Sequence, residues 1–170
     1  HHAPNLFFVG LAGTGKTTFL NGLAKAFDPF ERIVSIEDSR ELQLRQPNCL
    51  HLTYSRGGQG IAKVTPVDLM EACLRLTPDR AIIGELRGAE AYSYLELLNT
   101  GHEGSISTIH SNSPEEMYQR LAQMVMRFGT PLEMPQIIAF AKTLIHVVVQ
   151  LKHDKATGRR FVSEIRYAGA

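Results

Sequence analysis

The sequence has 170 residues, 44% of them hydrophobic and 21% charged, which is typical of one globular domain with a sizeable core and excludes a disordered or fibrous chain. The formal net charge is +1, so overall charge does not indicate a nucleic acid or an anionic membrane as a partner. The two cysteines, Cys49 and Cys73, form no CxxC motif and are expected to be reduced core residues, and no apolar run is long enough to span a bilayer.

The beginning of the sequence is abrupt, because His1 and His2 run within a few residues into an apolar segment. We expect residues 1–5 to be a tag remnant or linker and residues 6–170 to form the domain. We also expect the chain to be a fragment of a longer protein.

Short apolar runs without a helical period predict buried strands. The first is Leu6–Val9, and the later ones cover residues 32–37, 50–54, 81–85 and 105–110. Residues 146–152 and 160–166 are two β segments that predict an antiparallel hairpin. The segment Ser55–Gly60, SRGGQG, indicates a loop or a hairpin turn.

Helices are predicted between these strands, at residues 17–27, 89–98 and 136–144. Two more begin at Thr65 and Ser113, where a hydroxyl residue precedes Pro and an acid in capping-box order. The apolar residues from Met117 to Phe128 share one helical face and indicate core packing. Strands that alternate with helices predict an α/β fold with a mainly parallel sheet, helices on both faces and a C-terminal antiparallel hairpin.

Residues 10–17, GLAGTGKT, match G-x-x-x-x-G-K-[ST] between a predicted strand and a predicted helix. The glycines let backbone N–H groups turn inward around phosphate oxygens, and the helix adds its positive N-terminal end. Lys16 would carry positive charge to the outer phosphates, and the Thr17 hydroxyl would bind Mg²⁺. The predicted nucleotide-binding residues are Gly10, Ala12, Gly13, Thr14, Gly15, Lys16, Thr17 and Thr18.

The class of nucleotide follows from motifs that the sequence lacks. No D-x-x-G occurs, and the nearest approach to the base-reading N-K-x-D motif of GTPases is LKHD at residues 151–154. ATP is therefore favoured over GTP, while a small-molecule kinase remains open on the loop alone.

Acids stand at the carboxyl ends of two predicted strands, where ligands bind in open α/β sheets. Glu37 and Asp38 end the strand over 32–37, and a carboxylate there could orient an attacking water. The alternative is a helix start capped by Asp38 or Ser39. In AIIGELRGAEAY, residues 81–92, Glu85 could serve a metal ion, activate water, or be a solvated strand end.

Four segments in order resemble a known family. GLAGTGKTTFLN, RIVSIEDSREL, TPVDLMEACLRLTPDRAIIGELRGAEAY and TGHEGSISTIHSNSPEE are similar to the Walker A motif, acidic box, Walker B motif and histidine box of the traffic ATPases of bacterial type IV secretion systems. The resemblance extends from about Leu6 to Arg166. SRGGQGIAKVTP, the GELRG–AEAY passage and the lack of a zinc-type cysteine cluster favour this branch over the related type II secretion and pilus motors.

The resemblance implies a RecA-like P-loop ATPase that uses ATP and Mg²⁺ to power substrate transport or pilus assembly. It implies a homo-oligomer, a hexameric ring at the cytoplasmic face of the bacterial inner membrane, beside inner-membrane components of the secretion machinery. The family's N-terminal domain, which adds basic residues to the nucleotide and helps to build the ring, is expected to lie outside this sequence.

The resemblance also implies roles for single residues. Glu37 would polarise water, Glu85 would serve Mg²⁺ directly or through a water, and His110 would sense the outer phosphate, with His102 close by. Arg40 and Arg87 are further candidates for contact with phosphate or a subunit boundary, although each could instead pair with a nearby acid.

Other interpretations stay open from the sequence. The chain could be a nucleotide-binding or assembly module without turnover unless it is joined to its N-terminal domain and hexamer, or a DNA-moving motor, against which the net charge argues. The basic segment Lys152–Arg160 is interpreted as the solvated tip of a hairpin. SRGGQG is interpreted as a flexible connection, and His51, His146 and His153 as structural or solvated residues.

Overall fold

The computed structural model describes residues 3–55 and 64–168. Their strands form one seven-stranded sheet in the order β3-β2-β4-β5-β1-β6-β7. Every neighbouring pair is parallel except β6 and β7, which form an antiparallel hairpin. The strands are β1 (Leu6–Val9), β2 (Ile33–Glu37), β3 (Cys49–Thr53), β4 (Arg80–Leu86), β5 (Ile106–Ile109), β6 (Val147–His153) and β7 (Arg160–Tyr167). The predicted fold class is confirmed.

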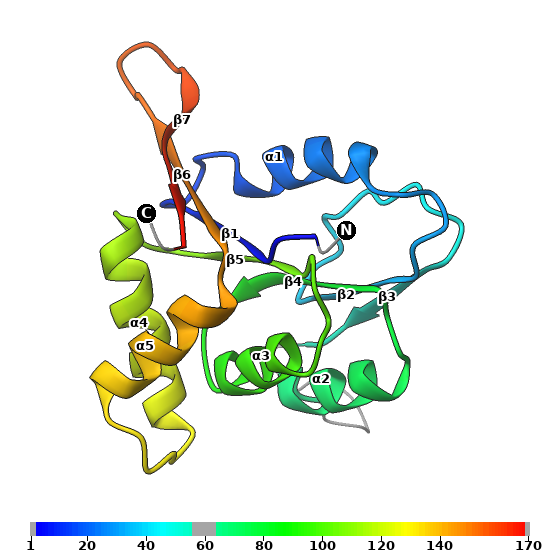
Figure 1. The fold of residues 1–170 in the computed structure, drawn as a ribbon. Coiled ribbons are helices and arrows are strands. Elements are labelled where there is room, and N and C mark those ends of the chain that lie inside the picture. Colours follow the sequence, from blue (N-terminus) through cyan, green and yellow to red (C-terminus); the bar gives the residue numbers. More distant parts are fainter. Residues whose placement is uncertain (1–2, 56–63, 169–170) are drawn as a thin grey trace.

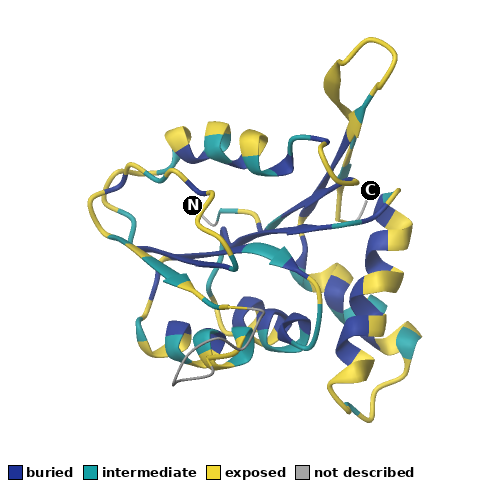
Figure 2. Cartoon of the chain, turned by 180° about the vertical axis from the view of Figure 1, so that it is seen from behind, coloured by how far each residue is buried: buried dark blue, intermediate teal, exposed yellow. Residues whose placement is uncertain are grey.

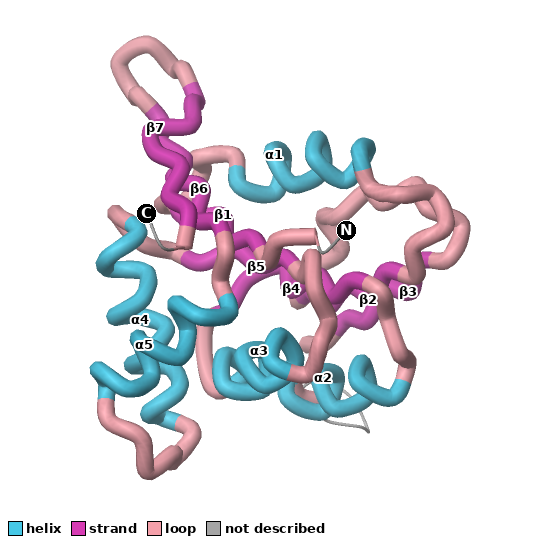
Figure 3. The backbone as a smooth tube through the Cα atoms, viewed as in Figure 1, coloured by secondary structure: helices cyan, strands magenta, loops and turns pink. Residues whose placement is uncertain are grey.

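Helices cover both faces of the sheet, as Figures 1 and 3 show. Helix α1 (Lys16–Leu23), with the short 3-10 turn η1 (Ala24–Ala26), lies on one face. The opposite face carries α2 (Pro66–Arg75), α3 (Glu90–Asn99), α4 (Pro114–Arg127) and α5 (Met134–Leu144). None of the helices in residues 3–55 and 64–168 is both long and apolar enough to cross a bilayer.

The core is split by the sheet into two layers, because successive side chains of a strand point to opposite faces. Each layer contains one cluster of buried apolar side chains. In β1, Phe7 belongs to the larger cluster and packs against Tyr94 of α3, with ring centroids 5.7 Å apart. Phe8 belongs to the smaller cluster and packs against Phe19 of α1, with centroids 5.3 Å apart. Figure 2 shows the central strands buried along their length. Burial on both faces explains why these strands appear in the sequence as continuous apolar runs.

Two helix starts differ in their capping. Thr65 forms the complete capping box with Asp68 that the sequence predicts. At α4 the Ser113 hydroxyl accepts from the N–H of Glu116 at 3.2 Å, but the Glu116 carboxylate accepts from the backbone N–H of Asn112 at 3.2 Å and from its side chain at 2.8 Å. The capping box predicted at Ser113 is therefore only half formed, because the Glu116 carboxylate accepts hydrogen bonds from Asn112 and not from the backbone N–H of Ser113.

Other sequence predictions need smaller corrections. The helix expected over 17–27 ends at Leu23 and continues as η1. His110 lies just beyond β5 rather than within it. Phe128 is 46% exposed and stacks on Tyr92, although the rest of its predicted face is buried. From residue 56 onward the predicted SRGGQG loop lies outside the described residues.

Candidate functional site

The carboxyl ends of the parallel strands meet at one edge of the sheet, where ligands bind in folds of this type. The glycine-rich loop follows β1, Glu37 ends β2, Glu85 lies near the end of β4, and His110 follows β5. A pocket of about 420 Å³ lies at this edge, within the usual range for small-molecule sites. The predicted site residues that line it are Ala12, Gly13, Gly15, Lys16, Thr17, Thr18, Glu37, Glu85, Arg87 and His110.

The loop has the torsions that its glycines permit. Gly13 and Gly15 have φ values of 74° and 89°, in the left-handed region that residues other than Gly rarely adopt. Because α1 begins directly after Gly15, the unpaired N–H groups of its first turn lie next to the pocket. Two predicted residues, Gly10 and Thr14, shape the loop instead of lining the pocket. A Cβ atom on Gly10 would lie 2.6 Å from the Leu151 carbonyl oxygen, and the Thr14 hydroxyl donates to the Leu11 carbonyl at 2.9 Å.

Lys16 folds back onto the same loop. Its ammonium group donates to the carbonyl of Gly10 at 2.7 Å and to that of Leu11 at 3.2 Å. Burial lowers the pKa of Lys16, while the negative charge of Glu85 acts in the opposite direction. The positive charge is thus held at the mouth of the loop, in electrostatic contact with the acid at the end of β4.

Glu37 is buried and fixed in place. Its Oε1 accepts from the backbone N–H groups of Glu41 and Leu42, both at 3.0 Å, and its Oε2 accepts from the Ser35 hydroxyl at 3.4 Å. Residues 38–48 form no helix, so the alternative of a helix capped by Asp38 or Ser39 is wrong. The carboxylate of Glu37 itself orders the turn after β2.

His51 supports this arrangement from β3. Its Nδ1 lies 2.7 Å from the Ser35 hydroxyl oxygen and 3.9 Å from Oε2 of Glu37. Burial and the nearby charge of Arg40 lower the pKa of His51, and the charge of Glu37 raises it. The expected structural role of His51 agrees with these contacts. His146 is also structural, since its Nδ1 accepts from the backbone N–H of Asn5 at 2.9 Å.

Glu85 is the centre of a polar chain across the pocket. Its Oε1 lies 2.7 Å from Nδ1 of His110, and this contact requires a proton on Nδ1 because an ionised carboxylate only accepts. Its Oε2 pairs with the Arg87 guanidinium, which also lies 3.5 Å from Oδ2 of Asp38. Glu85 is therefore no solvated strand end, and Arg87 pairs with acids, one of the two alternatives that the sequence left open.

Two candidates lie elsewhere. Arg40 is exposed and does not line the first pocket; it lines a neighbouring hollow formed by residues 40–45, which shares Glu41 and Leu42 with that pocket. His102 precedes β5, whereas His110 follows it, so the strand separates the two residues. Nδ1 of His102 lies 3.2 Å from both the Thr100 hydroxyl and the Leu97 carbonyl. The expectation that His102 lies close to His110 is wrong within this chain.

One residue at the loop could not be found from the sequence. Arg160, the first residue of β7, donates from Nε to the carbonyl of Gly13 at 2.7 Å, across 147 positions of sequence. Arg160 is exposed, as the interpretation of Lys152–Arg160 as a solvated hairpin tip predicts, but that interpretation does not include its contact with the loop. Motif spacing contains no signal for a contact between segments so far apart.

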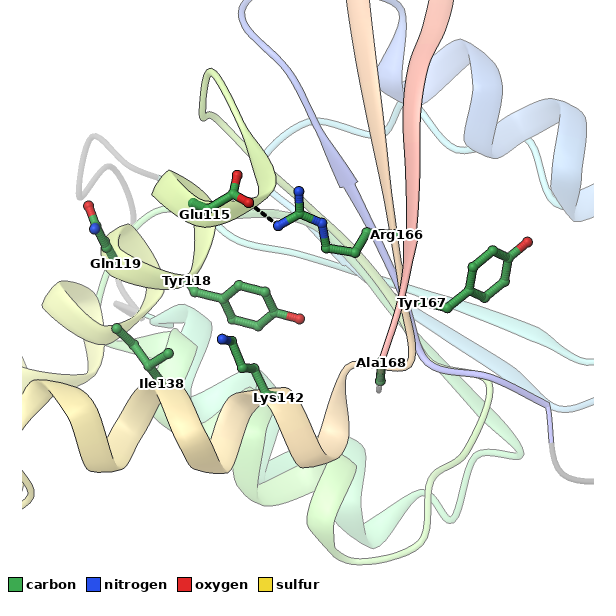
Figure 4. A pocket seen from close by; sticks show the side chains of 8 residues that line it. All are labelled: Glu115, Tyr118, Gln119, Ile138, Lys142, Arg166, Tyr167 and Ala168. Carbon is green, nitrogen blue, oxygen red and sulfur yellow. Dashed lines mark hydrogen bonds and ion pairs between the residues drawn. The ribbon is translucent and has the colours of Figure 1, made fainter. Parts of the chain in front are cut away.

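A second pocket of about 440 Å³ lies between α4, α5 and β7 and shares no lining residue with the first. Figure 4 shows Tyr118 and Lys142 pointing into it, and Arg166 paired with Glu115 at its rim. It has no glycine-rich loop among its lining residues, and the residue that it takes from the first turn of α4 is an acid, Glu115, so it lacks the features that the sequence predicts for nucleotide binding.

Comparison with known proteins agrees with this geometry. The Bartonella quintana protein "Type IV secretion system protein VirB11" is 37% identical over 165 residues, which are 96% of this chain and 46% of that protein. The "Protein VirB11" of Agrobacterium fabrum is 38% identical over 149 residues, 86% of this chain and 43% of that protein. The chain thus spans about half the length of the curated relatives it matches.

A solved structure gives the same result. The VirB11 ATPase from the Brucella suis type IV secretion system, in complex with sulphate, superposes with a TM-score of 0.88 at 34% identity, over 96% of this chain and 48% of that one. The model of the family described as "Type II/IV secretion system protein" matches residues 1–165. On this match, which covers nearly its whole length, the chain belongs to the type II/IV secretion system protein family.

Proposed function

We propose that this chain is the ATP-hydrolysing domain of a type IV secretion or conjugation ATPase. The observation that carries the proposal is the meeting of Lys16, Thr17, Glu37, Glu85 and His110 around one pocket at the mouth of a phosphate-binding loop. Such a site combines N–H donors, a buried cation and two carboxylates, which are the groups that phosphoryl transfer to water requires.

The loop and Lys16 would hold the phosphates. The ammonium group of Lys16 already lies on the Gly10 and Leu11 carbonyls, and it would exchange these contacts for phosphate oxygens. The residues placed to hold Mg²⁺ are Thr17, through its hydroxyl, and Glu85, directly or through a water, because hydroxyl and carboxylate oxygens are ligands that this ion accepts. Bound there, Mg²⁺ would neutralise charge that develops on the phosphates.

Glu37 is the candidate that orients water. Two backbone N–H groups occupy its Oε1. Its Oε2 has only longer contacts, with the Ser35 hydroxyl at 3.4 Å and with Nδ1 of His51 at 3.9 Å, so it is the oxygen better able to accept from a water. His110 would detect the outer phosphate, since its hydrogen bond to Glu85 links it to the same cluster.

The assembly that we propose follows the family. The intact protein would work as a homo-oligomer, a hexameric ring at the cytoplasmic face of the bacterial inner membrane, together with inner-membrane components of the secretion machinery. Relatives named VirB11 and PtlH in type IV secretion systems support this context.

Steady-state ATPase assays test the function, on this chain alone and joined to the family's N-terminal domain. We expect Mg²⁺-dependent turnover that is lost in Lys16→Ala. Turnover that persists in Lys16→Ala would overturn the assignment of the site. Binding of ATP without turnover in both forms would instead favour a binding or assembly module.

A further inference from the structure

The β6–β7 hairpin reaches the phosphate-binding loop from the far end of the chain. Figure 1 shows it rising beside the segment between β1 and α1. The Arg160 side chain lies against two glycines of the loop: its Nε donates to the Gly13 carbonyl at 2.7 Å, and a Cβ atom on Gly15 would lie 3.3 Å from its Cδ. The guanidinium therefore lies directly on the loop that is built to surround phosphate.

Arg160 differs from other arginines of the described residues in its partners. Within residues 3–55 and 64–168, no carboxylate forms an ion pair with it. Arg80, Arg87 and Arg166, by contrast, each pair with at least one acid. A guanidinium has five N–H donors, and the bond to Gly13 uses one of them. The residue is also exposed, so the remaining donors are accessible to a ligand in the loop.

The sheet order places Arg160 and Glu85 on opposite sides of the loop. Strand β1, which leads into the loop, lies between β5 and β6. Glu85 and His110 approach from the β4–β5 side, and Arg160 approaches from the β6–β7 side. Because the Glu85 side is where Lys16 and Mg²⁺ would hold the outer phosphates, a cation on the other side is positioned for phosphates nearer the nucleoside.

We infer that Arg160 is a nucleotide-binding residue whose guanidinium contacts the inner phosphates of the nucleotide held by the loop. The inference rests on the proposed function and adds a cation to the site from the C-terminal hairpin. It requires that Arg160 contribute to ADP and ATP binding equally, since both nucleotides carry the inner phosphates.

The test is the dissociation constant of ADP and of ATP for the purified chain, measured by titration calorimetry, with melting temperatures to verify folding. Charge-assisted hydrogen bonds contribute enough to binding that Arg160→Ala should raise the dissociation constants of both nucleotides by about 10-fold. Arg159→Ala is the matched control, because Arg159 is the exposed neighbour and loses the same charge from the same hairpin tip. It should leave both constants within about twofold of the unmodified chain, as surface substitutions usually have small effects.

Two conservative variants separate contact with phosphate from support of the loop. Both lysine and glutamine keep a donor for the Gly13 carbonyl, but only lysine keeps the charge. If Arg160 contacts phosphate, Arg160→Lys should bind ADP more tightly than Arg160→Gln does. The reverse order would overturn the inference in favour of a structural support.

The remaining outcomes are also decisive. Equal dissociation constants for Arg160→Ala and Arg159→Ala would overturn the inference but not the proposed function. A loss of affinity for ATP alone in Arg160→Ala would have the same consequence. Failure of the unmodified chain to bind either nucleotide would overturn the proposed function, and the inference with it.

Discussion

Gly84 and Glu37 lie so close together that a Cβ atom on Gly84 would be 3.1 Å from Cγ of Glu37. The two residues come from β4 and β2, which pair in parallel with Ile36 opposite Ile83. The glycine that precedes Glu85 therefore makes room for the other carboxylate of the pocket. The two acidic motifs are coupled through backbone packing.

This contact predicts the effect of Gly84→Ala. The added methyl group would press on a side chain that cannot easily move, because backbone N–H groups hold its Oε1. We expect the free energy of unfolding to fall by about 1 kcal/mol, at the lower end for overpacking, and turnover to fall by about 10-fold, since small displacements of catalytic groups are costly. Urea unfolding and ATPase assays measure both.

The matched control is Gly22→Ala, because a Cβ atom there meets nothing within 4 Å. In α1 it should leave the unfolding free energy unchanged or raise it by about 0.5–1 kcal/mol. Equal behaviour of the two alanine variants would show that Gly84 does not constrain Glu37.

Glu37→Gln should separate turnover from binding. The glutamine oxygen can still accept from the N–H groups of Glu41 and Leu42, so the turn after β2 should survive, but the charge that polarises water is lost. We expect turnover to fall by about 100-fold or more, as for loss of a general base, while the dissociation constant of ATP changes little. A large loss of ATP affinity at unchanged turnover would contradict the role given to Glu37.

Much of the fold follows from local signals, whereas the meeting of distant segments does not. Leu6–Val9 is a continuous apolar run, and the Thr65 cap is visible as Thr-Pro-x-Asp, because burial and capping depend on neighbouring residues. The order of strands in the sheet is not local. Glu85 meets His110 because β4 lies beside β5, and Arg160 meets Gly13 because β6 returns beside β1. The expectation for His102 is wrong because the four residues of β5 lie between His102 and His110.

Glu85→Gln, unlike Glu37→Gln, should change the dependence of turnover on Mg²⁺. The substitution removes the charge that pairs with Arg87 and His110 and a carboxylate that we expect to serve Mg²⁺. The Mg²⁺ concentration for half-maximal turnover should rise by about 10-fold, as when a partner of a metal site is lost. A magnesium titration at saturating ATP measures it. If Glu85→Gln left the titration unchanged and Glu37→Gln shifted it, the two roles would be reversed.

The pH dependence of stability should contain a contribution from His51. Burial and Arg40 lower the pKa of His51 in the folded chain below its ordinary value of 6.5. As the pH falls through 6.5, the unfolded chain therefore takes up a proton at this position before the folded chain does, and stability falls. Above that pH the imidazole is neutral in both states, and the contribution vanishes.

His51→Gln, which retains a partner for the Ser35 hydroxyl but does not titrate, should lose less unfolding free energy than the unmodified chain between pH 7.5 and 5.5. Arg40→Ala removes one of the two causes and should give an intermediate slope. Urea unfolding at several pH values measures these slopes, and a slope in His51→Gln as steep as in the unmodified chain would exclude His51 as the source.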